Sequence, residues 1–312
     1  TSPYYMVPPS GSTAERPQNP QPGTLRFNTD IGSLEYFKGD TLGWETINKV
    51  TPNLNGGGAR AVYGGGWTSP ANSNVVDYGS IESGGTFLDF GNLTRTDRHT
   101  HSGVSSRTRG CWGGGFPQST QATIDYITIP STGDAIDFGD MTSSGRIGAT
   151  GLSNQTRGCY LGGYSYSPGP LSARDVIDYI TIAQKGNAVD FGNLSAAKEF
   201  GSQTSCSSST RGIAFKVSGN SIEYITIATT GNTTDFGDVA STGAGAGLSN
   251  ATRGLIACGG NPGNHNTIEY ITISTLGNGV DFGDVDPVCY THLTLPTKAL
   301  VLISVVGVSL KK

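Results

Sequence analysis

Ile177-Asp178-Tyr179-Ile180-Thr181-Ile182 is one copy of a phrase that this chain of 312 residues carries five times. Three close copies begin at Ile124, Ile222 and Ile268, and a degraded copy runs from 75 to 81. Asp-Phe-Gly follows each copy after a glycine-containing turn, with successive spacings of 48, 53, 45 and 46 residues. A repeat of this length is typical of one supersecondary unit used several times in an array.

The third copy predicts four short strands. They are expected at Gly148–Ser153, Thr156–Gly163, Val176–Ile182 and Ala188–Phe191. The alternation along the third strand places one of its faces toward a core. Four antiparallel strands in roughly 45–50 residues describe a propeller blade. We therefore expect an all-β protein, a β-propeller of four-stranded blades preceded by a small β module; tandem hairpins in a flat solenoid are the alternative.

Composition excludes several classes of protein. Glycine contributes 47 residues, but without a Gly-X-Y period, and 14% of the chain is charged. These observations argue against collagen and against a disordered chain. The net charge of −4 and the absence of a basic stripe argue against nucleic-acid binding. No run of eighteen apolar residues exists, so we expect no insertion into a membrane.

The two ends of the chain differ from the repeats, which span 51–285. Residues 1–22 are rich in proline and polar side chains and are expected to form an extended tether. Residues 23–50 are expected to form a small attachment module with strands at Leu25–Asn28, Leu34–Phe37 and Trp44–Ile47. Residues 286–312 lack the repeat phrase. We interpret them as a spurious ending, where the reading frame runs off the true gene, or as a strand that closes the ring.

An arginine precedes the phrase in every unit, usually within Thr-Arg-Gly, and an aspartate opens every Asp-Phe-Gly. Because the two recur together, we expect a guanidinium–carboxylate ion pair, used as a structural clasp within or between blades. The residues are Arg60, Arg109, Arg157, Arg211 and Arg253, with Asp89, Asp137, Asp190, Asp235 and Asp281.

Few residues outside the repeat point to chemistry. We expect the cysteines to be free, buried thiols, because Cys111 and Cys159 occupy equivalent places in neighbouring units. His99 and His101 form a His-x-His, for which a solvent-facing or packed pair is favoured over metal binding. Turn aspartates such as Asp140 are expected to cap turns rather than bind calcium. We predict no catalytic residue, no metal and no cofactor.

The loop after the second strand varies between units and carries exposed polar and aromatic residues. These loops are expected to emerge on one face of the array, where an aromatic ring can stack on a sugar. The alternative is that the rings pack back onto the blades. The candidate ligand-binding residues are Trp67, Phe116, Tyr164, Tyr166 and His265.

The Gly-Gly after the second strand and the aromatic residue in the third resemble the kelch type of propeller. The full phrase, Thr-Arg-Gly, Ile-(Asp/Glu)-Tyr-Ile-Thr-Ile and Asp-Phe-Gly, resembles repeats in virion structural proteins of marine tailed phages, especially those of cyanobacteria. The stretch from Pro22 to Ile47, with Leu25-Arg26-Phe27-Asn28, Glu35 and Trp44, is similar to modules of phage fibres and tailspikes.

The resemblance implies a structural role in a phage virion, as a fibre or appendage component that meets the host surface. The implied partners are other virion proteins, held through the N-terminal region, further copies of the chain, and a host surface glycan. The implied location is the extracellular particle. The alternatives are a capsid or tail decoration protein without a receptor role, and a secreted kelch-like carbohydrate-active protein.

Overall fold

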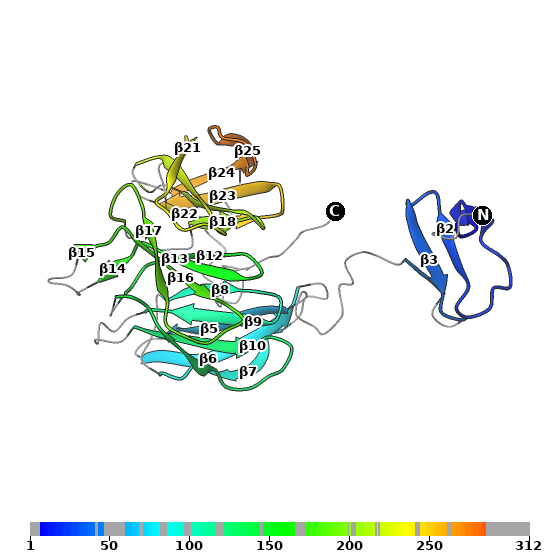
Figure 1. Ribbon diagram of the computed structural model, residues 1–312, viewed down its shortest axis with the longest axis horizontal. Coiled ribbons are helices and arrows are strands. Elements are labelled where there is room, and N and C mark those ends of the chain that lie inside the picture. The colour runs from blue at the N-terminus through cyan, green and yellow to red at the C-terminus, as the bar shows by residue number, and fades with distance from the viewer. Residues whose placement is uncertain are drawn as a thin grey trace. The chain divides into compact units, whose positions relative to one another are not determined.

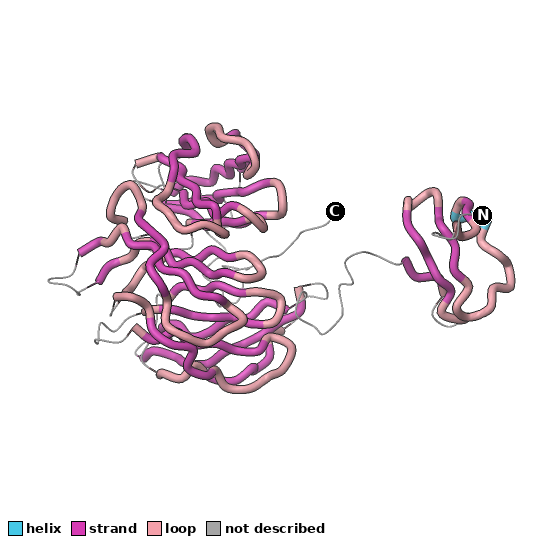
Figure 2. The backbone as a smooth tube through the Cα atoms, viewed as in Figure 1, coloured by secondary structure: helices cyan, strands magenta, loops and turns pink. Residues whose placement is uncertain are grey.

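The computed structural model describes residues 7–284 apart from 41–42, 47–59, 69–70, 82–85, 97–100, 116–121, 144–145, 166–171, 199, 201–203, 216, 218, 241–243 and 261–263. Over these residues the chain is all-β, and the helical content is a single 3-10 turn, η1 (Thr13–Glu15) (Figure 2). A helix with the length and apolar character of a membrane span does not occur among them. The chain divides into two compact units, Thr1–Leu54 and Asn55–Lys312.

The N-terminal unit is a four-stranded sheet in the order β1-β2-β3-β4. Strands β2 (Leu25–Asn28), β3 (Ser33–Phe37) and β4 (Trp44–Thr46) lie where the sequence predicts strands. Within the expected extended tether over 1–22, β1 (Ser10–Gly11) pairs in parallel with β2 and so joins the sheet of the module. The next residues, Ser12 and Glu15, form a capping box that begins η1.

The module is held together by a buried carboxylate rather than by a large apolar core. Glu35 is fully buried, accepts hydrogen bonds from Arg16 at 3.2 and 2.6 Å, and accepts another from Asn28 at 3.1 Å. The guanidinium of Arg26 lies 3.7 Å from the same carboxylate. The guanidinium carbons of Arg16 and Arg26 lie 5.7 and 6.0 Å from the ring centre of Trp44, within range of a cation–π contact.

This carboxylate makes the module sensitive to acid. Hydrogen bonds from Arg16, and then Asn28, hold the pKa of Glu35 below its ordinary value of 4.5. The stability it contributes is therefore complete above that value and is lost as the pH falls through the lowered pKa of the folded state. We predict that the fluorine NMR signal of fluorotryptophan at Trp44 shows acid unfolding in the parent chain. Glu35→Gln should lower stability at neutral pH and flatten this dependence, and an unchanged acid transition would contradict the assignment.

Over its described residues, the second unit contains five main sheets in succession, each connected to the next along the chain, and one two-stranded side sheet (Figure 1). The first is β5 (Arg60–Thr68), β6 (Ala71–Ser80) and β7 (Leu88–Asn92); the second is β8 (Ser102–Ser105), β9 (Arg109–Gly113), β10 (Thr123–Thr128) and β11 (Ile136–Asp140). The third is β12 (Thr150–Ser153), β13 (Arg157–Leu161), β16 (Val176–Thr181) and β17 (Val189–Asn193), with a side hairpin of β14 (Tyr164–Ser165) and β15 (Ser172–Ala173). The fourth is β18 (Ser205–Ser207), β19 (Arg211–Phe215), β20 (Ser221–Thr226) and β21 (Thr234–Asp238); the fifth is β22 (Ala244–Ser249), β23 (Arg253–Gly260), β24 (Asn264–Thr272) and β25 (Val280–Asp284).

Within each of the four-stranded sheets of this unit the strands are antiparallel and lie in chain order. The four strands predicted for the third copy are therefore confirmed, with bounds that differ by at most two residues. One expectation is wrong: the third strand does not turn a single face to a core. Ile177 and Asp178 are adjacent in β16 and both fully buried, because another sheet lies on either side.

Asp-Phe-Gly is the signature of a β-bulge. In the third sheet, Ile177 pairs with Gly192 and Asp178 pairs with Asp190, so Phe191 is the extra residue in β17. The register shifts at the equivalent place in every sheet of the array. The bulge glycine has φ of 144° here, a value that favours glycine. The phenylalanine ring meets the tyrosine of the third strand edge-on, with ring centres 5.9 Å apart in this sheet.

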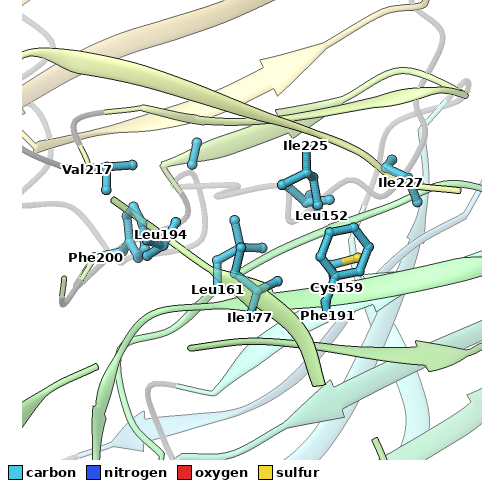
Figure 3. Close-up of a cluster of buried hydrophobic side chains, with 11 residues drawn as sticks. Leu152, Cys159, Leu161, Ile177, Phe191, Leu194, Phe200, Val217, Ile225 and Ile227 are labelled. Carbon is cyan, nitrogen blue, oxygen red and sulfur yellow. The ribbon is translucent and has the colours of Figure 1, made fainter. Parts of the chain in front are cut away.

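The hydrophobic cores lie between consecutive sheets. The cluster in Figure 3 joins Leu152, Cys159 and Phe191 of the third sheet to Ile225 of the fourth. Three further clusters occupy the spaces between the first and second, the second and third, and the fourth and fifth sheets. We call the face of a sheet that carries the bulge phenylalanine its trailing face, because the next sheet covers it.

The glycines of the repeat allow this close stacking. A Cβ on Gly237, in β21, would lie 2.5 Å from the carbonyl oxygen of Gly277 in the turn of the next sheet. Equivalent approaches of 2.5 Å are made by Gly91 and Gly139. Gly283, in the last described strand, has a similar φ of 133°, but a Cβ on this residue would meet none of the described atoms within 4 Å.

The pair Gly237 and Gly283 separates the clash from the backbone conformation. Alanine is strained at both positions, but only Gly237→Ala drives a methyl group into the neighbouring turn. We predict that Gly237→Ala lowers the free energy of unfolding by about 1–3 kcal/mol more than Gly283→Ala, as overpacking does. Urea unfolding measures the difference, and equal losses for the two variants would refute close stacking at this turn.

Candidate functional site

The repeated arginine joins neighbouring sheets. In the third sheet, the guanidinium carbon of Arg157 lies 4.5 Å from the ring centre of Tyr179, on the same sheet. Its Nη1 donates to the carbonyl oxygen of Ile227, in the next sheet, at 3.1 Å. The same two contacts recur for Arg60, Arg109 and Arg211, with carbonyl distances of 2.8, 3.1 and 2.9 Å. Arg253 makes the tyrosine contact at 4.6 Å.

The expected ion pair with the Asp-Phe-Gly aspartate is wrong. Asp89, Asp137, Asp190, Asp235 and Asp281 are all exposed. Over the described residues none of them forms an ion pair with a repeated arginine. The physical reason is that the arginine stacks on the third strand and reaches forward to a carbonyl, while the aspartate side chain leaves the bulge toward solvent. The clasp between sheets exists, but its acceptor is a backbone oxygen.

A turn from the next sheet covers the outer edge strand of each of the first four sheets. In the third sheet, the amide of Gly231 donates to the carbonyl oxygen of Phe191 at 2.7 Å, and the amide of Asn193 donates to Oδ1 of Asn232 at 3.0 Å. The pattern repeats at Gly133, Gly186 and Gly277, over the edge strands of the first, second and fourth sheets. An edge strand thus gains hydrogen-bond partners that a free sheet edge lacks.

The acid of the repeat phrase is buried between sheets. Asp125, Asp178, Glu223 and Glu269 are each at most 3% exposed. Each accepts a hydrogen bond from the segment that follows the fourth strand of the preceding sheet. The donors are Thr94 to Asp125 at 2.5 Å, Thr142 to Asp178, the amide of Ser195 to Glu223 at 3.2 Å, and the amide of Ala240 to Glu269 at 2.8 Å.

We call the contact region between two consecutive sheets a joint. At the joint between the second and third sheets, the buried acid forms an ion pair with a buried cation. Arg146 and Asp178 have fully buried side chains and form an ion pair. The guanidinium also donates to the carbonyl oxygens of Gly162, at 2.6 Å, and Tyr160, at 3.1 Å. Burial lowers the pKa of Arg146, and the neighbouring carboxylate opposes that shift. A pair of this kind contributes little over an apolar replacement, but losing one partner leaves a buried charge uncompensated.

Asp178 and Asp137 give a matched test of which repeated acid holds the array together. We predict that Asp178→Ala lowers the free energy of unfolding by about 3–5 kcal/mol, because Arg146 stays buried without its carboxylate. Asp137→Ala, at the exposed position, should change it by no more than about 0.5 kcal/mol. Thermal unfolding followed by circular dichroism measures both variants. A larger loss for Asp137→Ala would restore the aspartate of Asp-Phe-Gly to the clasp.

The first strands approach one another through small residues. The hydroxyl of Ser153 donates to the carbonyl oxygen of Ser105 at 2.9 Å. In the same way, the hydroxyl of Ser207 donates to the carbonyl oxygen of Ser153 at 2.7 Å, and the hydroxyl of Ser249 donates to the carbonyl oxygen of Ser207 at 2.8 Å. These bonds form a ladder along β8, β12, β18 and β22. The small-residue runs before each Thr-Arg-Gly therefore serve contact between sheets.

The predicted loop site lies mostly outside the described residues. Phe116 and Tyr166 fall in segments that the structure does not describe, and the side chains of Trp67 and His265 are also outside the description. By backbone, Trp67 pairs with Asn72 in the β5–β6 hairpin and His265 pairs with Gly259 in β23–β24. Tyr164 is half-buried in the β14–β15 hairpin, which projects from the third sheet in Figure 1. The loop site therefore stays a prediction.

The remaining candidate chemical groups are packed. Cys111, Cys159 and Cys206 are free and buried, as predicted, and burial raises the pKa of each thiol to about 12. A thiol at that pKa is protonated at neutral pH and is a poor nucleophile. Nε2 of His101 lies 2.6 Å from the carbonyl oxygen of Gly64, while His99 lies outside the described residues. Among the described residues no group of three His, Cys, Asp or Glu side chains is placed to hold a metal ion.

Comparison of the chain with protein-family models and with curated proteins finds no match. The contacts within the array therefore indicate what it can do. Its recurring arginine, acid and glycine all make sheet-to-sheet contacts.

The sequence contained a signal for the buried acid that we did not use. Every intact copy of the phrase, Ile-(Asp/Glu)-Tyr-Ile, places an acid within a run of large apolar side chains. In an ordinary half-buried strand, apolar residues that face the core alternate with polar residues that face the solvent. A charged residue at the centre of an apolar strand, repeated with the strand, indicates a buried carboxylate with dedicated donors.

Proposed function

We propose that this protein is a structural component of the virion of a tailed bacteriophage, a fibre or appendage that contacts the host surface by binding and without a catalytic step. The observation that carries the proposal is the use made of the recurring polar residues. The arginine, the buried acid and the turn amide all form hydrogen bonds that join one sheet to the next. A chain whose repeated chemistry is structural suits an architectural role, with recognition left to the loops that vary.

We also propose that the stacked sheets are blades of a kelch-like β-propeller. Three features support this arrangement: four-stranded antiparallel sheets in chain order, cores between consecutive sheets, and first strands that contact one another along the array. The N-terminal module, with its own buried network around Glu35, fits a separate attachment unit that binds other virion proteins.

The sugar-binding part of the proposal rests on the hairpin after the second strand. Tyr164 is a half-buried aromatic residue on a hairpin beyond the sheet, among serine residues. A ring held in this way can stack on the apolar face of a sugar, and we take its contribution as that of an aromatic pair, about 0.5–1.5 kcal/mol. The proposed ligand is a glycan of the host surface.

A glycan array probed with the intact chain tests this part. We expect binding to a small set of bacterial surface glycans, and Tyr164→Ala should weaken it about twofold to tenfold. Tyr36→Ala, at a half-buried tyrosine of the N-terminal unit, is the matched control and should bind as the parent does. Equal binding by both variants would remove Tyr164 from the ligand site, and no binding by the parent would favour the decoration protein.

The location is tested on particles of the phage that encodes the chain. Immunogold electron microscopy with antibodies against the repeat unit should label fibres or appendages. Label spread over the capsid or tail wall would support a decoration protein instead. Protein found only in the culture fluid, free of particles, would support the secreted carbohydrate-active alternative and end the virion proposal.

A further inference from the structure

The last sheet presents a trailing face that is built like the others and left open. Phe282, the bulge phenylalanine of β25, is 53% exposed, whereas its equivalents in the other four sheets are 2–3% exposed. Leu248 of β22 is 42% exposed, against 3% for its equivalent Leu152 in β12. Val280, by contrast, is 51% exposed and matches Val189 at 53%, so exposure rises only at positions that a following sheet covers elsewhere.

The polar groups of this face are also poised as in the covered joints. Arg253 stacks on Tyr270 at 4.6 Å, as the other repeated arginines stack on their tyrosines. Over the described residues, its guanidinium lacks the isoleucine carbonyl that Arg211 reaches at 2.9 Å in the preceding joint. Gly283 keeps the backbone conformation of the bulge, with φ of 133°, and none of the described turns lies against it.

The first sheet, at the other end of the array, is not the matching partner. Ala61 stands where the later units have the glycine of Thr-Arg-Gly, a position where Gly254 lies so close to Cys206 that a Cβ would be 2.6 Å from its sulfur. Thr86 stands where later turns carry the Asn or Asp that accepts from the edge strand. Phe87 replaces a small residue and packs on Tyr63 of its own sheet, with ring centres 5.5 Å apart.

From these contacts we propose that the trailing face of the fifth sheet is a binding surface for a sixth unit of the same repeat. The occupant is specified by what the internal joints use: a glycine in Arg-Gly at three of the four joints (Gly158, Gly212 and Gly254), and at all four an isoleucine carbonyl after the third strand, a Gly-Asn or Gly-Asp turn and an acid in Ile-(Asp/Glu)-Tyr. Residues 286–312 contain neither a Gly-Asn turn nor an Asp-Phe-Gly. The first sheet, of the same copy or of another, lacks the glycine and the turn residue. This inference does not depend on the virion function.

The test inserts a copy of residues 239–284 between Asp284 and Val285, with the rest of the chain retained. We expect the midpoint of thermal unfolding to rise by several degrees and amide exchange in β25 to slow. Gly283→Ala should then lower the midpoint by several degrees more in the extended chain than in the parent, because the methyl group meets the new turn. The matched control carries Glu269→Ala and Asn278→Ala in the inserted copy alone and should lose the gain.

Three results would overturn the proposal. One is an extended chain that is no more stable than its parent, with the same response to Gly283→Ala in both. Another is rapid proteolysis of the inserted unit while the five sheets persist. The proposal predicts that the same contacts that hold the fifth sheet on the fourth also hold the inserted unit on the fifth, so the inserted unit should be protected as well. The third is a parent chain that forms dimers through this face in sedimentation experiments, since the occupant would then be a second copy.

Discussion

The constraint on which the rest of this structure depends is that the third strand of each of the three middle sheets is buried on both faces. Ile177 and Asp178 are neighbours in one strand and neither is exposed, so a sheet on each side is required. A carboxylate in that position must receive hydrogen bonds, because an unpaired buried charge is strongly destabilising. Donors to Asp178 and Glu223 come from the segment that follows the fourth strand of the preceding sheet. A single unit is therefore incomplete, because its buried acid receives these hydrogen bonds only when the preceding sheet has packed against it.

The N-terminal module solves a smaller version of the same problem. It is too small to bury a large core, and Glu35 gathers Arg16 and Asn28 around one carboxylate instead. Trp44 lies near both Arg16 and Arg26, so Arg26, Asn28, Glu35 and Trp44 of the sequence pattern meet in one network. In both units the residues that mark the sequence most clearly are those that hold strands together.

Much of the fold could be predicted from the sequence because strand periodicity and turn residues are local signals. The repeat length, the four strands of the third copy and the three strands of the module were predicted this way. Contacts between sheets were not, because co-occurrence of Arg157 and Asp190 in a repeat does not say that they touch. The bulge at Phe191 turns Asp190 outward, and only the register of β16 and β17 reveals it. The parallel pairing of Ser10–Gly11 was missed for a similar reason, since proline and polar residues hide a short strand.

A double-mutant cycle across one joint tests the central claim most directly. Ser195, after the fourth strand of the third sheet, donates from its amide and its hydroxyl to Glu223 in the fourth. Stability would be measured for Ser195→Ala, Glu223→Gln and the double variant by urea unfolding. If buried acids hold the sheets together, the two changes should couple by about 0.5–3 kcal/mol. Effects that add within about 0.3–0.5 kcal/mol would mean that the acid and the preceding sheet act independently, and the account of the joints would fail.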